Sequence, residues 1–160
     1  MSVAAGAAMS STTTSRREFC AQAVSLVSIG TLLQGCGGNP SGPSNTPALP
    51  TVGATASGGA VAITIDGTSP LATVGSAALV QTGSGNFLVS RTGQETFTAL
   101  TAVCTHEACT ITGFQSPTFV CPCHGSEFTT SGAVARGPAS APLRQFATRF
   151  AANVLTITVA

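Results

Sequence analysis

The residues with the clearest chemistry lie between positions 104 and 128. Four of the six cysteines of the chain and both of its histidines fall in this stretch. They are Cys104, His106, Cys109, Cys121, Cys123 and His124. Thiolate and imidazole groups are preferred ligands of iron, copper and zinc, whereas magnesium and calcium prefer oxygen ligands. The stretch is therefore predicted to be a metal site with two arms, and each arm offers both a thiolate and an imidazole.

The two arms resemble the two cluster-binding boxes of the Rieske iron–sulfur proteins. They read Cys-Thr-His-Glu-Ala-Cys at 104–109 and Cys-Pro-Cys-His-Gly-Ser at 121–126. Residues 137–142, which begin Gly-Pro-Ala, more loosely resemble the proline loop that covers the cluster in this family. The resemblance implies one [2Fe-2S] cluster per chain, with two cysteines on one iron and two histidines on the other.

Carried over position by position, the resemblance assigns a role to the residues of both boxes. The implied cluster ligands are Cys104 and Cys121 on the inner iron, and His106 and His124 on the outer iron. The resemblance also pairs Cys109 with Cys123 in a disulfide that locks the two loops together. Ser126 matches the serine whose hydroxyl bonds a bridging sulfide of the cluster.

The mixed ligand set has a direct electrostatic consequence. Two neutral imidazoles in place of two thiolates make the cluster less negative, so that it accepts an electron more readily. Reduction potentials accordingly lie at roughly −150 to +300 mV, compared with about −400 mV for plant-type clusters held by four cysteines. A histidine that binds iron through one ring nitrogen keeps the other for proton exchange. The chain is therefore expected to transfer electrons, with a proton able to follow.

Three positions depart from the family pattern. Phe128 stands where high-potential members have a tyrosine that donates a hydrogen bond to a cluster cysteine sulfur, and Glu107 and Ala108 stand where many members have Leu and Gly. Fewer hydrogen bonds to sulfur, and a carboxylate beside the outer iron, both leave the reduced cluster less stabilised. We expect a potential below that of the tyrosine-bearing members, and Glu107 and Phe128 weigh against a quinol-oxidising role.

The residues also allow other kinds of site. Structural zinc accepts two cysteines and two histidines, and a disulfide framework with incidental histidines is a further alternative. Zinc alone does not explain the second pair of cysteines or the Gly-Pro-Ala segment at 137–139. No catalytic residue is expected, because both histidines of the chain are assigned to the cluster and none remains to activate a nucleophile or to hold the mononuclear iron of a Rieske oxygenase.

Charge and composition exclude other partners. Lysine is absent, and between residues 36 and 160 four arginines balance four acidic residues. Such a chain has no basic stripe for a phosphate backbone, so nucleic-acid binding is not expected. Long-range steering of a strongly charged partner is not evident either.

The first 36 residues have the pattern of an export signal. Arg16 and Arg17 precede an apolar run at 21–33, which is shorter than the roughly 20 residues of a membrane-spanning helix. This pattern predicts the twin-arginine route, which exports folded proteins together with their cofactors. Residues 33–36, Leu-Gln-Gly-Cys, resemble a lipobox, so Cys36 is a candidate for lipidation. An uncleaved signal helix is the competing anchor. Either anchor leaves the protein on the periplasmic, outer face of a bacterial membrane, where disulfides persist.

Residues 37–59 are rich in Pro, Gly and Ser and are predicted to form a flexible tether. Residues 60–160 are predicted to form a small all-β domain, an antiparallel sandwich or open barrel with the metal loops at one end. The runs with β propensity or alternating polarity lie at 61–65, 77–81, 87–91, 96–103, 118–121, 144–151 and 154–159, with a tight turn before the last of them.

The combined reading is an exported, membrane-tethered carrier of single electrons. The expected donor is quinol-linked, on the side of a cytochrome b, and the expected acceptor is a c-type cytochrome. The alternative is the small electron-transfer subunit of another periplasmic oxidoreductase with a larger cofactor-bearing chain. A structural zinc module is the third reading.

Overall fold

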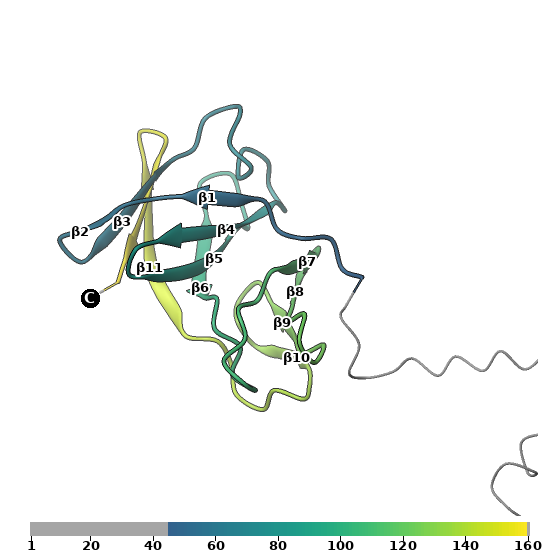
Figure 1. Cartoon of the computed structure of the whole chain (residues 1–160). Helices are drawn as coiled ribbons and strands as arrows, with labels where there is room; N and C mark the ends of the chain where they lie inside the picture. The colour runs from purple at the N-terminus through teal and green to yellow at the C-terminus, as the bar shows by residue number, and fades with distance from the viewer. Residues whose placement is uncertain (1–44, 160) are drawn as a thin grey trace, which may run out of the picture. The chain divides into compact units, whose positions relative to one another are not determined.

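Residues 45–159 are described by a computed structural model, and they form β-strands without any helix. The strands are β1 (Thr51–Gly53), β2 (Ala56–Ser57), β3 (Ala60–Thr64), β4 (Ala77–Thr82), β5 (Gly85–Arg91), β6 (Phe97–Thr101), β7 (Gly113–Gln115), β8 (Thr118–Val120), β9 (Glu127–Thr129), β10 (Val134–Arg136), β11 (Gln145–Ala151) and β12 (Val154–Thr158). Eight strands form a large sheet in the order β1-β4-β5-β6-β11-β12-β3-β2, and four form a small sheet in the order β10-β9-β8-β7 (Figure 1). This range therefore contains no helix long and apolar enough to cross a membrane.

The predicted all-β class is confirmed, and the seven predicted strands lie within two residues of observed ones. The turn between β11 and β12 has positive φ at Ala152 and Asn153, as a two-residue hairpin turn requires. The pairing is antiparallel throughout, except that β1 runs parallel to β4. The sequence pattern misses β1, β2, β7, β9 and β10, because strands of two or three residues are too short to show an alternating pattern.

The central strands β4 and β5 are buried on both faces. Because side chains alternate along a strand, Leu79 and Leu88 enter one core and Val80 and Val89 enter the other. The first core lies between the large sheet and the loops and strands of the metal-binding region, and its members include Cys104 and Cys121. The second lies between the two halves of the large sheet. The metal loops therefore pack against one face of the large sheet, and the second core covers the opposite face of its central strands.

The chain joins the domain earlier than the predicted tether boundary at residue 60. Leu49 is buried in the first core, and its N–H donates to the carbonyl of Thr112 at 2.7 Å. Directly after it, β1 pairs with β4 of the large sheet. Residues 49–53 therefore bridge the two sheets. The sequence pattern does not show this, because the bridge uses backbone groups in a segment of small residues and prolines. Residues 37–44 lie outside the described range.

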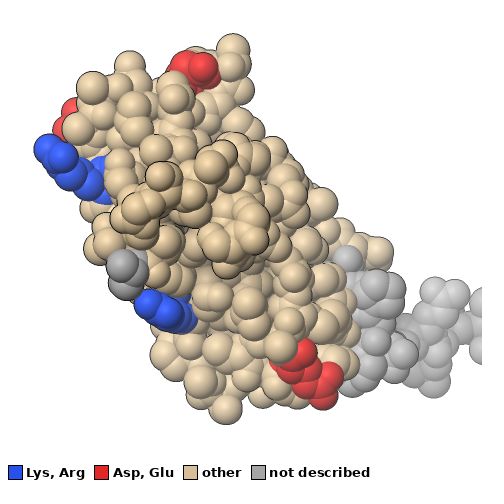
Figure 2. Space-filling model, turned by 60° about the vertical axis from the view of Figure 1, so that its left-hand side comes forward, with Lys and Arg blue, Asp and Glu red and all other residues tan. Residues whose placement is uncertain are grey.

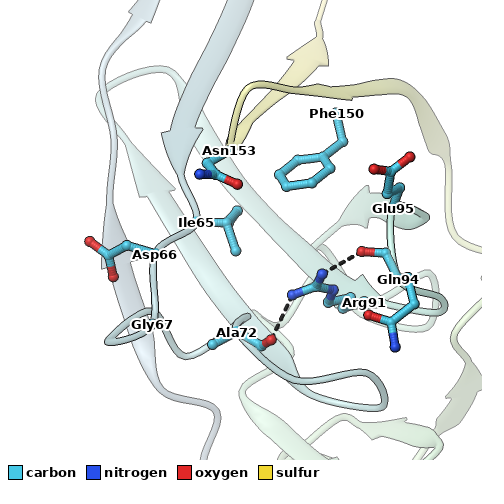
Figure 3. Close-up of a pocket in the computed structure, with 9 residues that line it drawn as sticks. All are labelled: Ile65, Asp66, Gly67, Ala72, Arg91, Gln94, Glu95, Phe150 and Asn153. Atoms are coloured by element: carbon cyan, nitrogen blue, oxygen red, sulfur yellow. Dashed lines mark hydrogen bonds between the residues drawn. The ribbon is translucent and has the colours of Figure 1, made fainter.

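Arg91 ties together the loops at the end of the domain where β6 begins. Its Nη1 donates to the carbonyl of Ala72 at 2.6 Å, its Nη2 donates to the carbonyl of Gln94, and its guanidinium lies 5.3 Å from the centre of the Phe97 ring. The guanidinium also lines a cavity of about 520 Å³, to which Phe150 contributes an apolar wall (Figure 3). This cavity lies at the start of β6, whereas the other end of β6 leads into the metal loops.

The two metal loops share one backbone conformation. In the first, the N–H of Cys104 donates to the carbonyl of Cys109 at 2.8 Å, and the N–H of Ala108 donates back to Cys104 at 2.9 Å. In the second, Cys121 and Ser126 form the same pair at 2.8 Å, and Gly125 donates back to Cys121 at 3.0 Å. The fifth residue of each loop has a left-handed backbone, with φ of 54° in the first and 70° in the second. The first loop therefore has an alanine where glycine costs less.

Replacing Ala108 with glycine is expected to stabilise the domain by about 0.5 to 1 kcal/mol. A left-handed backbone costs a non-glycine residue about 1 to 2 kcal/mol, and the extra entropy of glycine in the unfolded chain returns about 0.4 to 1 kcal/mol of that. Denaturant unfolding of the purified protein measures the change. The matched reverse variant is Gly125→Ala in the second loop, which should lose a similar amount. An Ala108→Gly variant that is less stable than the parent would contradict the shared geometry.

Candidate metal centre

Cys104 and Cys121 form the buried half of the site. Their side chains are 2% and 1% exposed, and neither is in a disulfide. Burial raises the pKa of the Cys121 thiol; the backbone N–H of Cys123 acts in the opposite direction, and the neighbouring Cys104 thiol raises the pKa further. Both sulfurs therefore lie together in an apolar layer. A metal centre that binds there must displace their protons, so its affinity will depend on pH.

The two histidines form the outer half of the site. The rings of His106 and His124 meet edge to face, with their centres 5.0 Å apart and their planes at 88°. His106 is exposed and His124 is half-buried. A ring nitrogen of each lies within 4.8 Å of the other and of a Glu107 carboxylate oxygen. The imidazoles therefore converge at the surface, while the thiols converge beneath it.

The predicted disulfide is present between Cys109 and Cys123, with an S–S distance of 2.09 Å. It joins the first metal loop to the second. The chain-entropy model gives a cross-link that closes a loop of about 15 residues a stabilisation of roughly 3 kcal/mol. These two sulfurs also lie within 4.8 Å of the Cys121 sulfur. Because they are bonded to each other, they are not available as thiolate ligands.

A third loop, residues 137–142, closes the site from the other side. The buried hydroxyl oxygen of Ser126 accepts a hydrogen bond from the N–H of Ala139 at 3.0 Å, which ties this loop to the second metal loop. The hydroxyl of Thr105 donates to the carbonyl of Ala141 at 2.6 Å, which ties it to the first. The Ser126 hydrogen remains available for a further acceptor. The role of Thr105 was not predicted, and only its place between the first cysteine and histidine points to it.

The residues that depart from the family pattern lie in contrasting places. Phe128 is fully buried in the core that also holds Cys104 and Cys121. The Glu107 carboxylate is 61% exposed, and its Oε2 lies 3.7 Å from Nδ1 of His124. The second acidic residue near the loops, Glu127, pairs with Arg136 at 3.2 Å. Glu107 is thus the acidic group that bears directly on the outer half of the site.

The donor set fits a [2Fe-2S] cluster with mixed ligands. It supplies two buried thiols and two imidazoles, one of each from each loop, and the backbone N–H groups of Cys123 and His124 point at the Cys121 sulfur. N–H groups that face a sulfur stabilise negative charge on it. Every predicted site residue lies in this arrangement, except that Cys36 lies outside the described residues.

Comparison with known proteins agrees with this reading. A sequence model of the Rieske [2Fe-2S] domain matches residues 63–147. The cytochrome b6-f complex iron-sulfur subunit of Prochlorococcus marinus strain MIT 9301 is 39% identical over 69 residues, which are 41% of this chain and 39% of that protein. The subunit of the same name from Chlorobaculum tepidum is 31% identical over 64 residues, which are 39% of this chain and 35% of that protein. The chain thus matches less than two fifths of the length of these relatives.

Solved structures give the same result. The plasma membrane Rieske protein PetC3 from the cyanobacterium Synechocystis PCC 6803 superposes with a TM-score of 0.50 and 30% identity, over 59% of this chain and 97% of that one. A chain from the complex of oxygenase and ferredoxin in carbazole 1,9a-dioxygenase has a TM-score of 0.50 and 22% identity, over 59% and 97%. The second likeness supports the fold alone. With the match over residues 63–147, these findings show that the chain belongs to the Rieske [2Fe-2S] family.

Proposed function

We propose that this protein is an exported, membrane-tethered carrier of single electrons between a quinol-linked donor and a c-type cytochrome. The observation that carries the proposal is the difference in exposure between the two halves of the site. The thiols of Cys104 and Cys121 are buried, whereas the imidazoles of His106 and His124 reach the surface. A centre of this kind can exchange electrons with another protein through its outer half while the sulfur half stays shielded from water.

In this proposal, Cys104 and Cys121 hold the inner iron and His106 and His124 hold the outer iron. When bound, the cluster supplies a one-electron redox centre of raised potential. The chain keeps the thiolates dry in the apolar core and locks the two loops with the Cys109–Cys123 disulfide. The hydroxyl of Ser126 and the N–H groups near Cys121 stabilise negative charge on sulfur. The histidine nitrogen that does not bind iron can exchange a proton with solvent or with a quinol.

The proposed partners come from the relatives and from the site. The curated relatives are named as subunits of the cytochrome b6-f complex, which supports a cytochrome b partner on the quinol side. The buried Phe128 and the exposed Glu107 favour a lower potential and the second candidate, the small subunit of another periplasmic oxidoreductase. Affinity purification of the natural assembly separates the two, because a cytochrome b accompanies the protein in the first case and a larger cofactor-bearing chain in the second.

Replacing Phe128 with tyrosine is expected to raise the reduction potential by about 20 to 60 mV. A hydrogen bond to sulfur with a net strength of about 0.5 to 1.5 kcal/mol, converted at 59 mV per tenfold, gives this range. A redox titration followed by electron paramagnetic resonance measures it. The control is Phe150→Tyr, which adds the same hydroxyl at the cavity beside Arg91, far from the loops. Equal potentials in the parent and the Phe128→Tyr variant would contradict the assigned role of this position.

Export and anchoring rest on the N-terminal pattern, which lies outside the described residues. Replacing both Arg16 and Arg17 with lysine is expected to hold the protein in the cytoplasm, because the twin-arginine route reads this pair. Replacing Cys36 with serine should release the exported protein from the membrane into the soluble periplasmic fraction. Cell fractionation with immunodetection reads both results. Export of the double-lysine variant would refute the assigned route, and a Cys36→Ser variant that stays in the membrane would indicate anchoring by an uncleaved helix.

A further inference from the structure

A groove of about 340 Å³ lies beside the first metal loop. It is formed where β5 begins, where β6 ends and where β11 begins, and its lining includes Phe87, Val103, Arg144 and Phe146. Val103 directly precedes the proposed ligand Cys104. Because β6 leads into the first metal loop, the groove lies at the metal end of the large sheet, opposite the cavity that Arg91 lines.

The groove has an apolar surface that is open to solvent. Val103 is 47% exposed, and only Val74 is a similarly exposed large apolar side chain in the described part of the molecule. The rings of Phe87 and Phe146, which also line the groove, meet edge to face with their centres 5.0 Å apart. An exposed apolar side chain beside aromatic rings and an arginine has the composition of a contact site for another molecule.

A single oriented cation lies in this groove. The guanidinium of Arg144 is 4.7 Å from the centre of the Phe146 ring, so the side chain is held by stacking. Within residues 45–159, the ion pairs join other groups, and Arg144 has none. Arg91, by contrast, donates its hydrogen bonds to backbone carbonyls. Arg144 therefore presents a fork of N–H donors, which matches a carboxylate.

The surrounding surface does not supply a competing field. Figure 2 shows few charged side chains on one face of the molecule, with an acidic and a basic group side by side at its upper left edge and the others apart. At the metal loops, Glu127 is already paired with Arg136, and Glu107 lies on the histidine side of the site. An anion that approaches the first metal loop from the Val103 side therefore meets the positive charge of Arg144, which no ion pair within residues 45–159 neutralises.

We propose that this groove docks an acidic electron partner, whose carboxylate pairs with Arg144 and whose adjacent apolar side chains cover Val103 and Phe146. The proposal rests on the electron-carrier function above and adds a second contact surface, beside Cys104 instead of at the histidine tip. A cationic partner would then meet the domain at Glu107, and an anionic partner would meet it at Arg144.

The test uses two trianions of the same shape as probes. Ferricyanide takes one electron from each reduced cluster and becomes ferrocyanide, and stopped-flow absorbance follows the rate. At an ionic strength of about 10 mM, where the Debye length is about 30 Å, Arg144→Gln should slow this step by roughly three- to tenfold. The difference should shrink to less than about twofold near 1 M salt, where the Debye length is about 3 Å.

The matched control is Arg149→Gln, which removes the same charge from an exposed position on β11 outside the groove. Its rate should stay within about twofold of the parent. Arg144→Lys retains the charge and should retain most of the rate, which separates lost attraction from lost folding. Equal slowing by Arg144→Gln and Arg149→Gln, or no slowing by either, would overturn the proposal.

A binding measurement keeps the proposal separate from the electron-carrier function. Hexacyanochromate(III) is paramagnetic and does not accept the electron, so it broadens the nuclear magnetic resonance signals of the residues it visits. Broadening should centre on Asn86, Phe87 and Phe146 and should disappear in the Arg144→Gln variant. If the parent protein fails to reduce ferricyanide but shows this broadening, the carrier function fails and the groove stands. Broadening centred on Arg136 or Arg149 would show that the groove is not the anion site.

Discussion

The burial of Cys104 and Cys121 in one apolar layer is the constraint on which the rest of the structure depends. Two thiolates at that depth are unfavourable without a cation. The iron of the cluster would supply the positive charge that offsets this cost. The large sheet forms the floor of this layer and is itself supported by a second core behind it. The disulfide and the 137–142 loop hold the two metal loops from above. Each of these features keeps the sulfurs dry while the imidazoles remain at the surface.

The gathering of the cysteines and histidines at one place and the long strands can be predicted from the sequence, because both leave strong signals. Cysteines and histidines are rare in this chain, so their spacing is informative, and strands of five or more residues show their alternation. In the small sheet, β8 lies within a predicted run, whereas β7, β9 and β10 were missed because three residues are too few to show the alternation. The bridge at residues 49–53 was also missed, because its hydrogen bonds come from the backbone of a segment that has the composition of a tether. The groove that Arg144 lines depends on the pairing of β6 with β11, which the sequence does not reveal.

Local charge, more than net charge, distinguishes the surfaces of this domain. Its four arginines and four acidic residues cancel in sum, and several of them have local partners. Arg91 holds backbone carbonyls and Arg136 pairs with Glu127. Glu107 and Arg144 are the two that flank the metal loops without a partner of opposite fixed charge among the described residues. A weakly charged carrier with one acidic and one basic group near its metal centre can discriminate between partners at short range, although it steers them little at long range.

The most direct test of this account is electron paramagnetic resonance of the dithionite-reduced protein, grown with ¹⁵N-labelled histidine and purified anaerobically. The account predicts a rhombic signal with an average g value below that of ferredoxins held by four cysteines, and spin-echo modulation from two histidine nitrogens, which Cys104→Ser or His124→Ala would abolish or alter. A colourless, silent protein that contains zinc after iron reconstitution would contradict it. So would a cluster whose signal lacks histidine nitrogen coupling.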